Sequence, residues 1–101
     1  MLIKNICFYP GIVKYNSFNI DFDKPLTSQT NELNEDLIQV EYKNNYILDI
    51  GWYPEGDEKG RIIVQLIHNN KWDKPIIKEE CFEYETVINV ICRIVSFLNT
   101  Q

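Results

Sequence analysis

Histidine, cysteine, glycine and proline are all scarce in this sequence. One histidine, three cysteines, four glycines and four prolines occur among 101 residues. Zinc sites need several histidine or cysteine ligands at short spacings, and Cys7, Cys81 and Cys92 are too far apart to provide them. An odd number of cysteines also argues against a disulfide framework. We therefore expect no metal, no cofactor and no disulfide, and we predict that the three thiols are free and buried.

Motifs of common enzymes are also lacking. The sequence has no glycine-rich phosphate loop, no metalloprotease helix motif and no calcium-binding loop. The single histidine, His68, has no pattern around it that supplies both a nucleophile and an orienting carboxylate. We expect His68 to lie at the end of a strand, and we predict no catalytic residue. A small enzyme that uses His68 with a carboxylate is kept as the weakest alternative.

No hydrophobic run is long enough to cross a membrane. The apolar stretch Met1–Tyr9 contains Lys4 and ends at Pro10-Gly11, unlike a secretory signal. Acidic residues outnumber basic residues by 15 to 10, which gives a net charge of -5. This charge repels nucleic-acid backbones and anionic lipids and attracts basic proteins. We therefore predict a cytoplasmic protein that binds neither nucleic acid nor membranes.

Length and composition predict one globular domain over residues 1–101, with 45% hydrophobic and 25% charged residues. Alternating apolar residues or short apolar runs predict strands over Met1–Tyr9, Ile12–Phe22, Asp36–Lys43, Tyr46–Tyr53, Arg61–His68 and Ile76–Phe82. Asn44-Asn45 suits a two-residue hairpin turn because asparagine tolerates positive φ. Asp23–Asn34 is polar and predicts a loop with at most one helical turn.

The last part of the chain predicts a helix. Apolar residues recur there at helical spacing: Val87, Ile88, Val90, Ile91, Ile94, Val95, Phe97 and Leu98. These residues cover more than half of the helix circumference, so we expect loops or the N-terminal strand to cover the flanks of the helix. A homodimer is a further way to cover them. Phe82–Glu85 lacks the usual polar capping residue, which leaves the helix start undefined. The predicted fold is α+β, an antiparallel sheet of four to six strands with one long C-terminal helix packed on one face.

Aromatic and acidic residues together indicate a protein-binding surface. Trp52 alternates with Leu48 and Ile50 and is expected in the core, whereas Trp72 lies in a polar connection. Acidic residues flank these rings, which suits a basic protein partner better than a nucleic acid. The expected partner-binding residues are Glu41, Asp49, Glu55, Asp57, Glu58, Trp72 and Asp73.

The segment Ile47–Glu55 reads ILDIGWYPE, and NKWDKPI follows at residues 70–76. With the C-terminal helix, this pattern resembles small bacterial immunity proteins encoded beside polymorphic toxins, including those of contact-dependent growth inhibition systems. The resemblance covers residues 36–100. It implies a cytoplasmic antitoxin that binds one cognate toxin C-terminal domain, often a nuclease, without cofactor or catalysis. The other alternative is a non-catalytic regulatory or scaffold protein that recognises a peptide or host protein at an exposed sheet edge.

Overall fold

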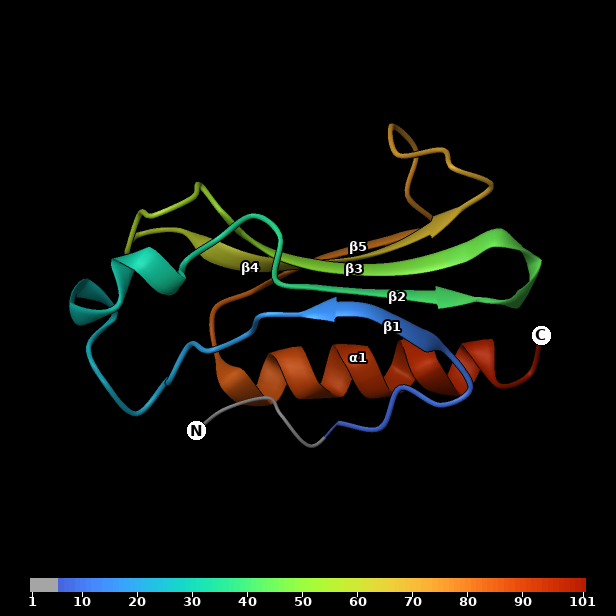
Figure 1. The fold of residues 1–101 in the computed structure, drawn as a ribbon, viewed down its shortest axis with the longest axis horizontal. Helices are drawn as coiled ribbons and strands as arrows, with labels where there is room; N and C mark the ends of the chain where they lie inside the picture. Colours follow the sequence, from blue (N-terminus) through green and yellow to red (C-terminus); the bar gives the residue numbers. More distant parts are fainter. Residues whose placement is uncertain (1–5) are drawn as a thin grey trace.

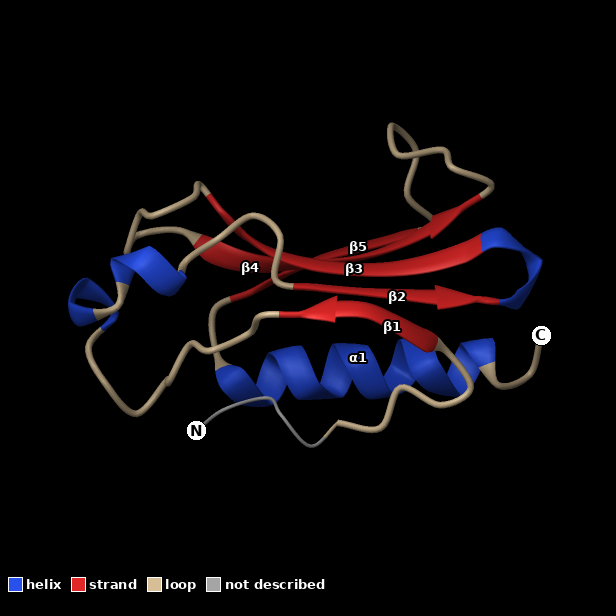
Figure 2. Ribbon diagram, viewed as in Figure 1, coloured by secondary structure: helices blue, strands red, loops and turns tan. Residues whose placement is uncertain are grey.

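A computed structural model describes residues 6–101 and shows a curved sheet with one helix against it (Figure 1). The strands are β1 (Ile12–Asn16), β2 (Ile38–Tyr42), β3 (Tyr46–Tyr53), β4 (Arg61–His68) and β5 (Ile77–Cys81), and the helix is α1 (Tyr84–Leu98). The strands lie side by side in sequence order, each antiparallel to its neighbours. This arrangement confirms the predicted α+β fold with a C-terminal helix on one face of the sheet (Figure 2).

The core lies between α1 and the sheet. The alternation predicted for β3 and β4 is confirmed, because both strands bury their even-numbered apolar residues toward α1. This set is Leu48, Ile50, Trp52, Ile62, Val64 and Leu66. The helix contributes Val87, Ile91 and Ile94 to the same core. No helix of the described chain is long and apolar enough to cross a bilayer.

The predicted strand over Met1–Tyr9 is not a strand in its described part. Residues 1–5 lie outside the described residues, and Ile6–Tyr9 pairs with no other strand. Phe8 instead packs into the core, and its carbonyl oxygen accepts a 2.8 Å hydrogen bond from Tyr42 Oη. The segment runs alongside α1 (Figure 1), and Ile6 and Cys7 lie against the helix flank formed by Ile91, Cys92 and Val95. It therefore covers a flank of the apolar helix, as expected, but without joining the sheet.

The strand predicted over Ile12–Phe22 ends earlier, at Asn16. The Asn16 side chain accepts a 3.1 Å hydrogen bond from the backbone N–H of Phe18, which turns the chain out of the sheet. Phe18 and Ile20 alternate as a strand would, but they enter the core from a loop. Apolar alternation here reflects burial rather than strand pairing.

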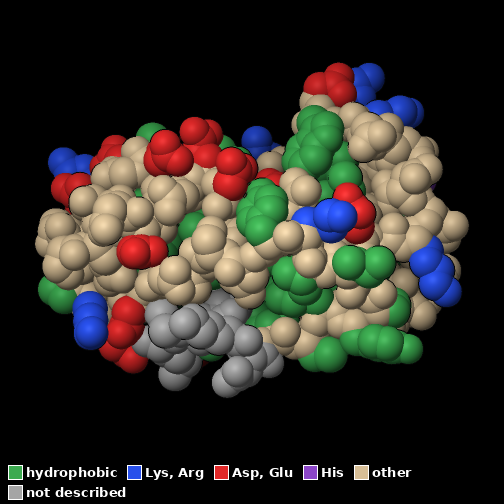
Figure 3. All heavy atoms as spheres, viewed as in Figure 1, with side chains coloured by type: hydrophobic (Ala, Val, Ile, Leu, Met, Phe, Trp, Pro, Cys, Tyr) green, Lys and Arg blue, Asp and Glu red, His purple; other side chains and the backbone are tan. Residues whose placement is uncertain are grey.

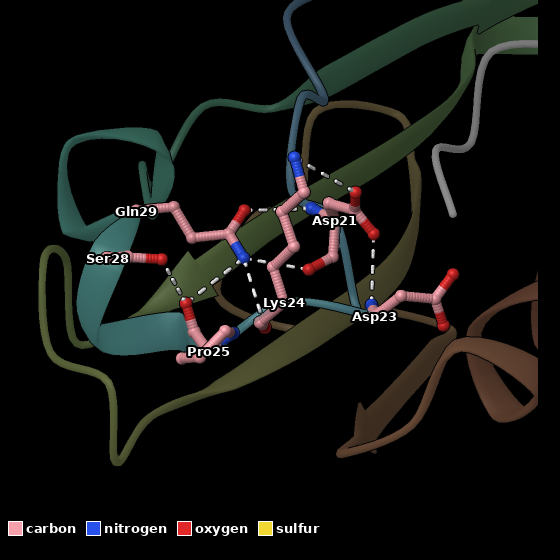
Figure 4. A network of polar contacts seen from close by, with 6 residues as sticks. All are labelled: Asp21, Asp23, Lys24, Pro25, Ser28 and Gln29. Atoms are coloured by element: carbon pink, nitrogen blue, oxygen red, sulfur yellow. Dashed lines mark hydrogen bonds and ion pairs between the residues drawn. The ribbon is translucent and has the colours of Figure 1, made fainter.

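The Asp23–Asn34 loop contains two short 3-10 turns, Leu26–Ser28 and Thr30–Glu32, one more than predicted. The Gln29 amide secures the loop start, since its oxygen accepts from Asp21 N at 2.9 Å and its nitrogen donates to Asp21 O at 2.7 Å (Figure 4). These bonds satisfy the Asp21 backbone in a segment without strand partners.

The β2–β3 connection has the predicted positive φ values, but it is one residue longer than the predicted two-residue turn. Asn44 and Asn45 have positive φ values, 62° and 63°. Because Tyr42 pairs with Tyr46, the loop comprises the three residues Lys43–Asn45, not two.

All three cysteines are free, but only Cys81 is buried. Cys7 and Cys92 are exposed, so the predicted burial of all three thiols is wrong. Cys92 directly follows the buried Ile91, and one residue along a helix turns the side chain by about 100°. It therefore lies on a flank of α1 and not against the sheet.

Candidate functional site

The sheet surface that faces away from α1, here called the open face, carries a row of polar side chains. The strand register places Tyr15, Gln39, Asp49, Gln65 and Lys78 opposite one another, one from each strand. Figure 1 shows no helix over this face, although the β4–β5 loop rises above it near one end. The row therefore places polar side chains across the middle of the open face.

Asp49 is the buried member of this row, with 5% of its surface exposed. Gln65 Nε2 donates a long 3.5 Å hydrogen bond to Asp49 Oδ2, and the Gln39 side chain is a second hydrogen-bond partner. Burial raises the pKa of Asp49, the Asp36 charge adds to this rise, and the two glutamine amides oppose it. Within residues 6–101, no lysine or arginine forms an ion pair with Asp49.

A buried carboxylate held only by neutral amides costs folding free energy at neutral pH. Positions that lower stability in this way are candidates for function, because packing alone would favour an apolar or neutral residue there. Asp49 therefore marks the open face as the candidate site.

Exposed acidic residues gather near Asp49 because two distant segments lie together. Trp52 N donates to Asn34 O at 2.9 Å, and Glu35 N donates to Glu55 Oε1 at 3.2 Å. Gly51 permits this approach, since a Cβ there would lie 1.9 Å from Glu35 O. The resulting group, here called the acidic end, consists of Glu35, Asp36, Asp49, Glu55, Asp57 and Glu58. Figure 3 shows acidic side chains gathered at this end of the molecule.

Two half-buried tyrosines adjoin the acidic end. Burial, followed by the charges of Asp36 and Asp49, raises the pKa of Tyr15 to about 12. Burial and the charges of Asp49, Glu35 and Asp36 raise the pKa of Tyr53. Both phenols therefore stay protonated at neutral pH, and they offer aromatic rings and hydroxyl groups beside the carboxylates.

The structure brings together part of the predicted binding set and separates the rest. Asp49, Glu55, Asp57 and Glu58 all belong to the acidic end. Glu41 also lies on the open face, where it forms a 3.8 Å ion pair with Lys14. The other predicted residues, Trp72 and Asp73, lie in the β4–β5 loop, at the opposite end of the eight-residue strand β4. At about 3.3 Å per residue, β4 separates Trp72 and Asp73 from the loop residues Asp57 and Glu58 by roughly 25 Å. Asp49, which pairs with Gln65, lies midway along the sheet.

The residues of this site that were not predicted from the sequence are Tyr15, Glu35, Asp36 and Tyr53 at the acidic end, and Gln39 and Gln65 beside Asp49. A glycine within a strand pattern is a known sign of close backbone approach, and Gly51 carried that signal. It shows that some segment lies over β3, but not which one.

Trp52 and His68 lie where the sequence predicted. Trp52 is buried as predicted, and its Nε1 donates a 2.7 Å hydrogen bond to Asp57 O. Trp72, whose burial could not be predicted from the sequence, is 45% exposed. His68 ends β4, and its ring stacks on that of Tyr46 at 4.2 Å.

Among residues 6–101, no group of three or more histidine, cysteine, aspartate or glutamate side chains could hold a metal ion. Comparisons with protein-family models, with curated proteins and with solved structures find no match to this chain.

Proposed function

We propose that this chain is a non-catalytic immunity protein that neutralises a basic toxin C-terminal domain, such as a nuclease, in the cytoplasm. The observation that carries the proposal is Asp49, a buried carboxylate that pairs with no lysine or arginine among residues 6–101 and lies within reach of the charge of the exposed Asp36. A basic partner would supply the missing positive charge on binding. The sequence resemblance to immunity proteins supports the same class of function.

Charge also supports a basic partner. The net charge of -5 attracts basic domains over long distances and raises their rate of encounter. At the acidic end, Arg61 is already bound to Glu80 at 2.9 Å and to Tyr53 O at 3.3 Å, and Lys59 in the β3–β4 loop offsets one of the six carboxylates. The acidic end therefore keeps an excess of negative charge for a partner.

Capture followed by a growth assay tests this proposal. The tagged chain would be captured from its own host at low salt, and co-purifying proteins would be identified by mass spectrometry. The captured domain would then be expressed in bacteria with and without this chain. We expect a basic domain that arrests growth alone and loses that effect when this chain is present. A captured domain whose toxicity is unchanged by this chain would contradict the proposal.

Reversing two charges in the β3–β4 loop is expected to weaken binding. The double variant Asp57→Lys/Glu58→Lys should raise the Kd for the basic domain at least tenfold, about 1.4 kcal/mol, because it replaces attraction with repulsion. Calorimetry at two salt concentrations measures both the affinity and its salt dependence.

The matched control is Glu79→Lys/Glu83→Lys, which makes the same change in net charge away from the open face. Both residues are exposed, and Glu83 makes no side-chain capping bond to α1. We expect the control to weaken binding by less than threefold. Equal losses for the two double variants would show that net charge, and not the acidic end, governs affinity.

The outer edge of β1 favours a second candidate, a scaffold protein that adds a partner peptide to its sheet. Ile12 and Val13 are 67% and 44% exposed on this edge. Lys14 and the register shift between Val13 and Tyr15 oppose such pairing. The variant Ile12→Lys would abolish capture if this edge binds the partner and would leave capture unchanged if the acidic end does.

A further inference from the structure

The acidic end and its two tyrosines offer several groups that could all interact with one positively charged side chain. Asp36 and Asp49 offer negative charge, and the Gln39 amide offers an oxygen acceptor. Tyr15 and Tyr53 offer ring faces whose electrons attract cations. The strand register places Tyr15 and Asp49 in one row across the sheet. The Tyr53 ring and the Glu35 carbonyl both lie against Gly51 on the same face, with Tyr53 Cε2 3.0 Å and Glu35 O 1.9 Å from the position of an added Gly51 Cβ.

Arginine suits this set better than lysine. Its guanidinium is planar, binds a carboxylate through two parallel N–H groups and stacks on aromatic rings. It is also less strongly hydrated than an ammonium group, so its transfer to a half-buried site costs less. Lysine offers a compact, strongly hydrated charge that gains little from the rings.

On the basis of the proposed function, we infer that the acidic end receives one arginine side chain of the partner, with its guanidinium between Tyr15 and Tyr53 and bound to Asp36 and Asp49. Asp49 is only 5% exposed, so a neighbouring side chain must turn aside on binding. Tyr15 belongs to the edge strand β1, next to the register shift that follows Val13, and can turn at least cost to the sheet.

Two tryptophans make the position of binding observable. The Trp52 indole N–H is bonded to Asp57 O, at the acidic end, and Trp72 lies in the β4–β5 loop, at the other end of β4. In a ¹⁵N-labelled sample of the full chain, each indole gives its own N–H signal. A ligand at the acidic end should shift the Trp52 signal and leave the Trp72 signal in place.

The test is an NMR titration of the full chain with hexa-arginine and hexa-lysine peptides at equal ionic strength. We expect hexa-arginine to bind at least fivefold more tightly and to shift the Trp52 indole signal. Asp49→Asn should remove this preference by weakening hexa-arginine binding to the level of hexa-lysine. The control Glu79→Gln removes one charge from the other side of the sheet and should keep the preference.

Equal affinities for the two peptides, no binding of hexa-arginine, or a larger shift of Trp72 than of Trp52 would overturn the inference. These outcomes are separate from failure of the proposed function. If the chain protects cells from a basic domain but does not distinguish the peptides, only the arginine site is wrong. If the peptides are distinguished but no basic domain is captured, the site stands and the immunity function fails.

Discussion

Gly51→Ala is expected to lower the free energy of unfolding by about 3 kcal/mol, the upper end of the usual cost of overpacking. The added Cβ would lie 1.9 Å from Glu35 O and 2.9 Å from Glu35 C, both backbone atoms. Because Gly51 belongs to β3, the central strand of the sheet, the Glu35 segment must move away. For a domain of this size the melting temperature should fall by roughly 12–24 °C, which thermal denaturation followed by circular dichroism measures.

Gly56→Ala is the comparison variant for this experiment. The nearest atom to its added Cβ, Thr30 O, is 4.0 Å away, so no clash arises. Its cost comes from the positive φ of 73°, about 1 kcal/mol. If Gly51→Ala were no more destabilising than Gly56→Ala, the close packing of Glu35 over β3 would be wrong.

Asp49→Asn is expected to raise stability and to lower partner affinity. Asparagine keeps the shape of aspartate and can still hydrogen-bond to Gln39 and Gln65, but it carries no charge into the buried position. We expect a gain of about 1 kcal/mol in unfolding free energy at pH 7. We also expect a loss of about 2 kcal/mol in binding free energy, roughly 30-fold in Kd, because the partner cation loses its buried acceptor.

The gain in stability should depend on pH. Burial raises the pKa of Asp49 in the folded state above its ordinary value of 3.8. The folded wild type therefore holds its proton to higher pH than the unfolded chain does, and it loses stability as pH rises through this interval. The two proteins should be similarly stable below pH 3.8 and differ above the raised pKa. Urea denaturation from pH 3 to pH 8 measures this difference.

A variant that is less stable than the wild type at every pH would contradict this account. That result would mean that Asp49 contributes a favourable charge interaction within the folded chain, and its burial would then be no sign of a binding site. The Asp49 variant is therefore informative whichever way its stability changes.

The central strands could be predicted from the sequence because burial and alternation agree there. The predicted boundaries of Tyr46–Tyr53 and Arg61–His68 are those of β3 and β4. The N-terminal segment also has apolar residues at strand spacing, but Phe8 uses this spacing to pack beside α1. Periodicity identifies buried side chains, and it does not decide whether the backbone pairs with a strand or crosses a helix.

The candidate site could be predicted only in part, because it depends on which segments meet. Asp57 and Glu58 are visible in the sequence as an acidic loop, but their association with Glu35 and Asp36 comes from long-range backbone bonds such as Gly56 N to Leu33 O, at 2.7 Å. No local pattern specifies such a contact. The prediction that Trp72 lies with these residues was wrong because consecutive turns of an antiparallel sheet fall at opposite ends of the strands.

The most direct test of the central claim is a parallel capture from the native host at low salt with three forms of the chain. These are the wild type, Asp57→Lys/Glu58→Lys and the control Glu79→Lys/Glu83→Lys. We predict that the wild-type chain captures a basic toxin domain in a one-to-one ratio. The control should retain this domain, and the acidic-end variant should lose it. A partner retained on all three forms, or no partner on the wild type, would contradict the claim that the acidic end binds a basic toxin.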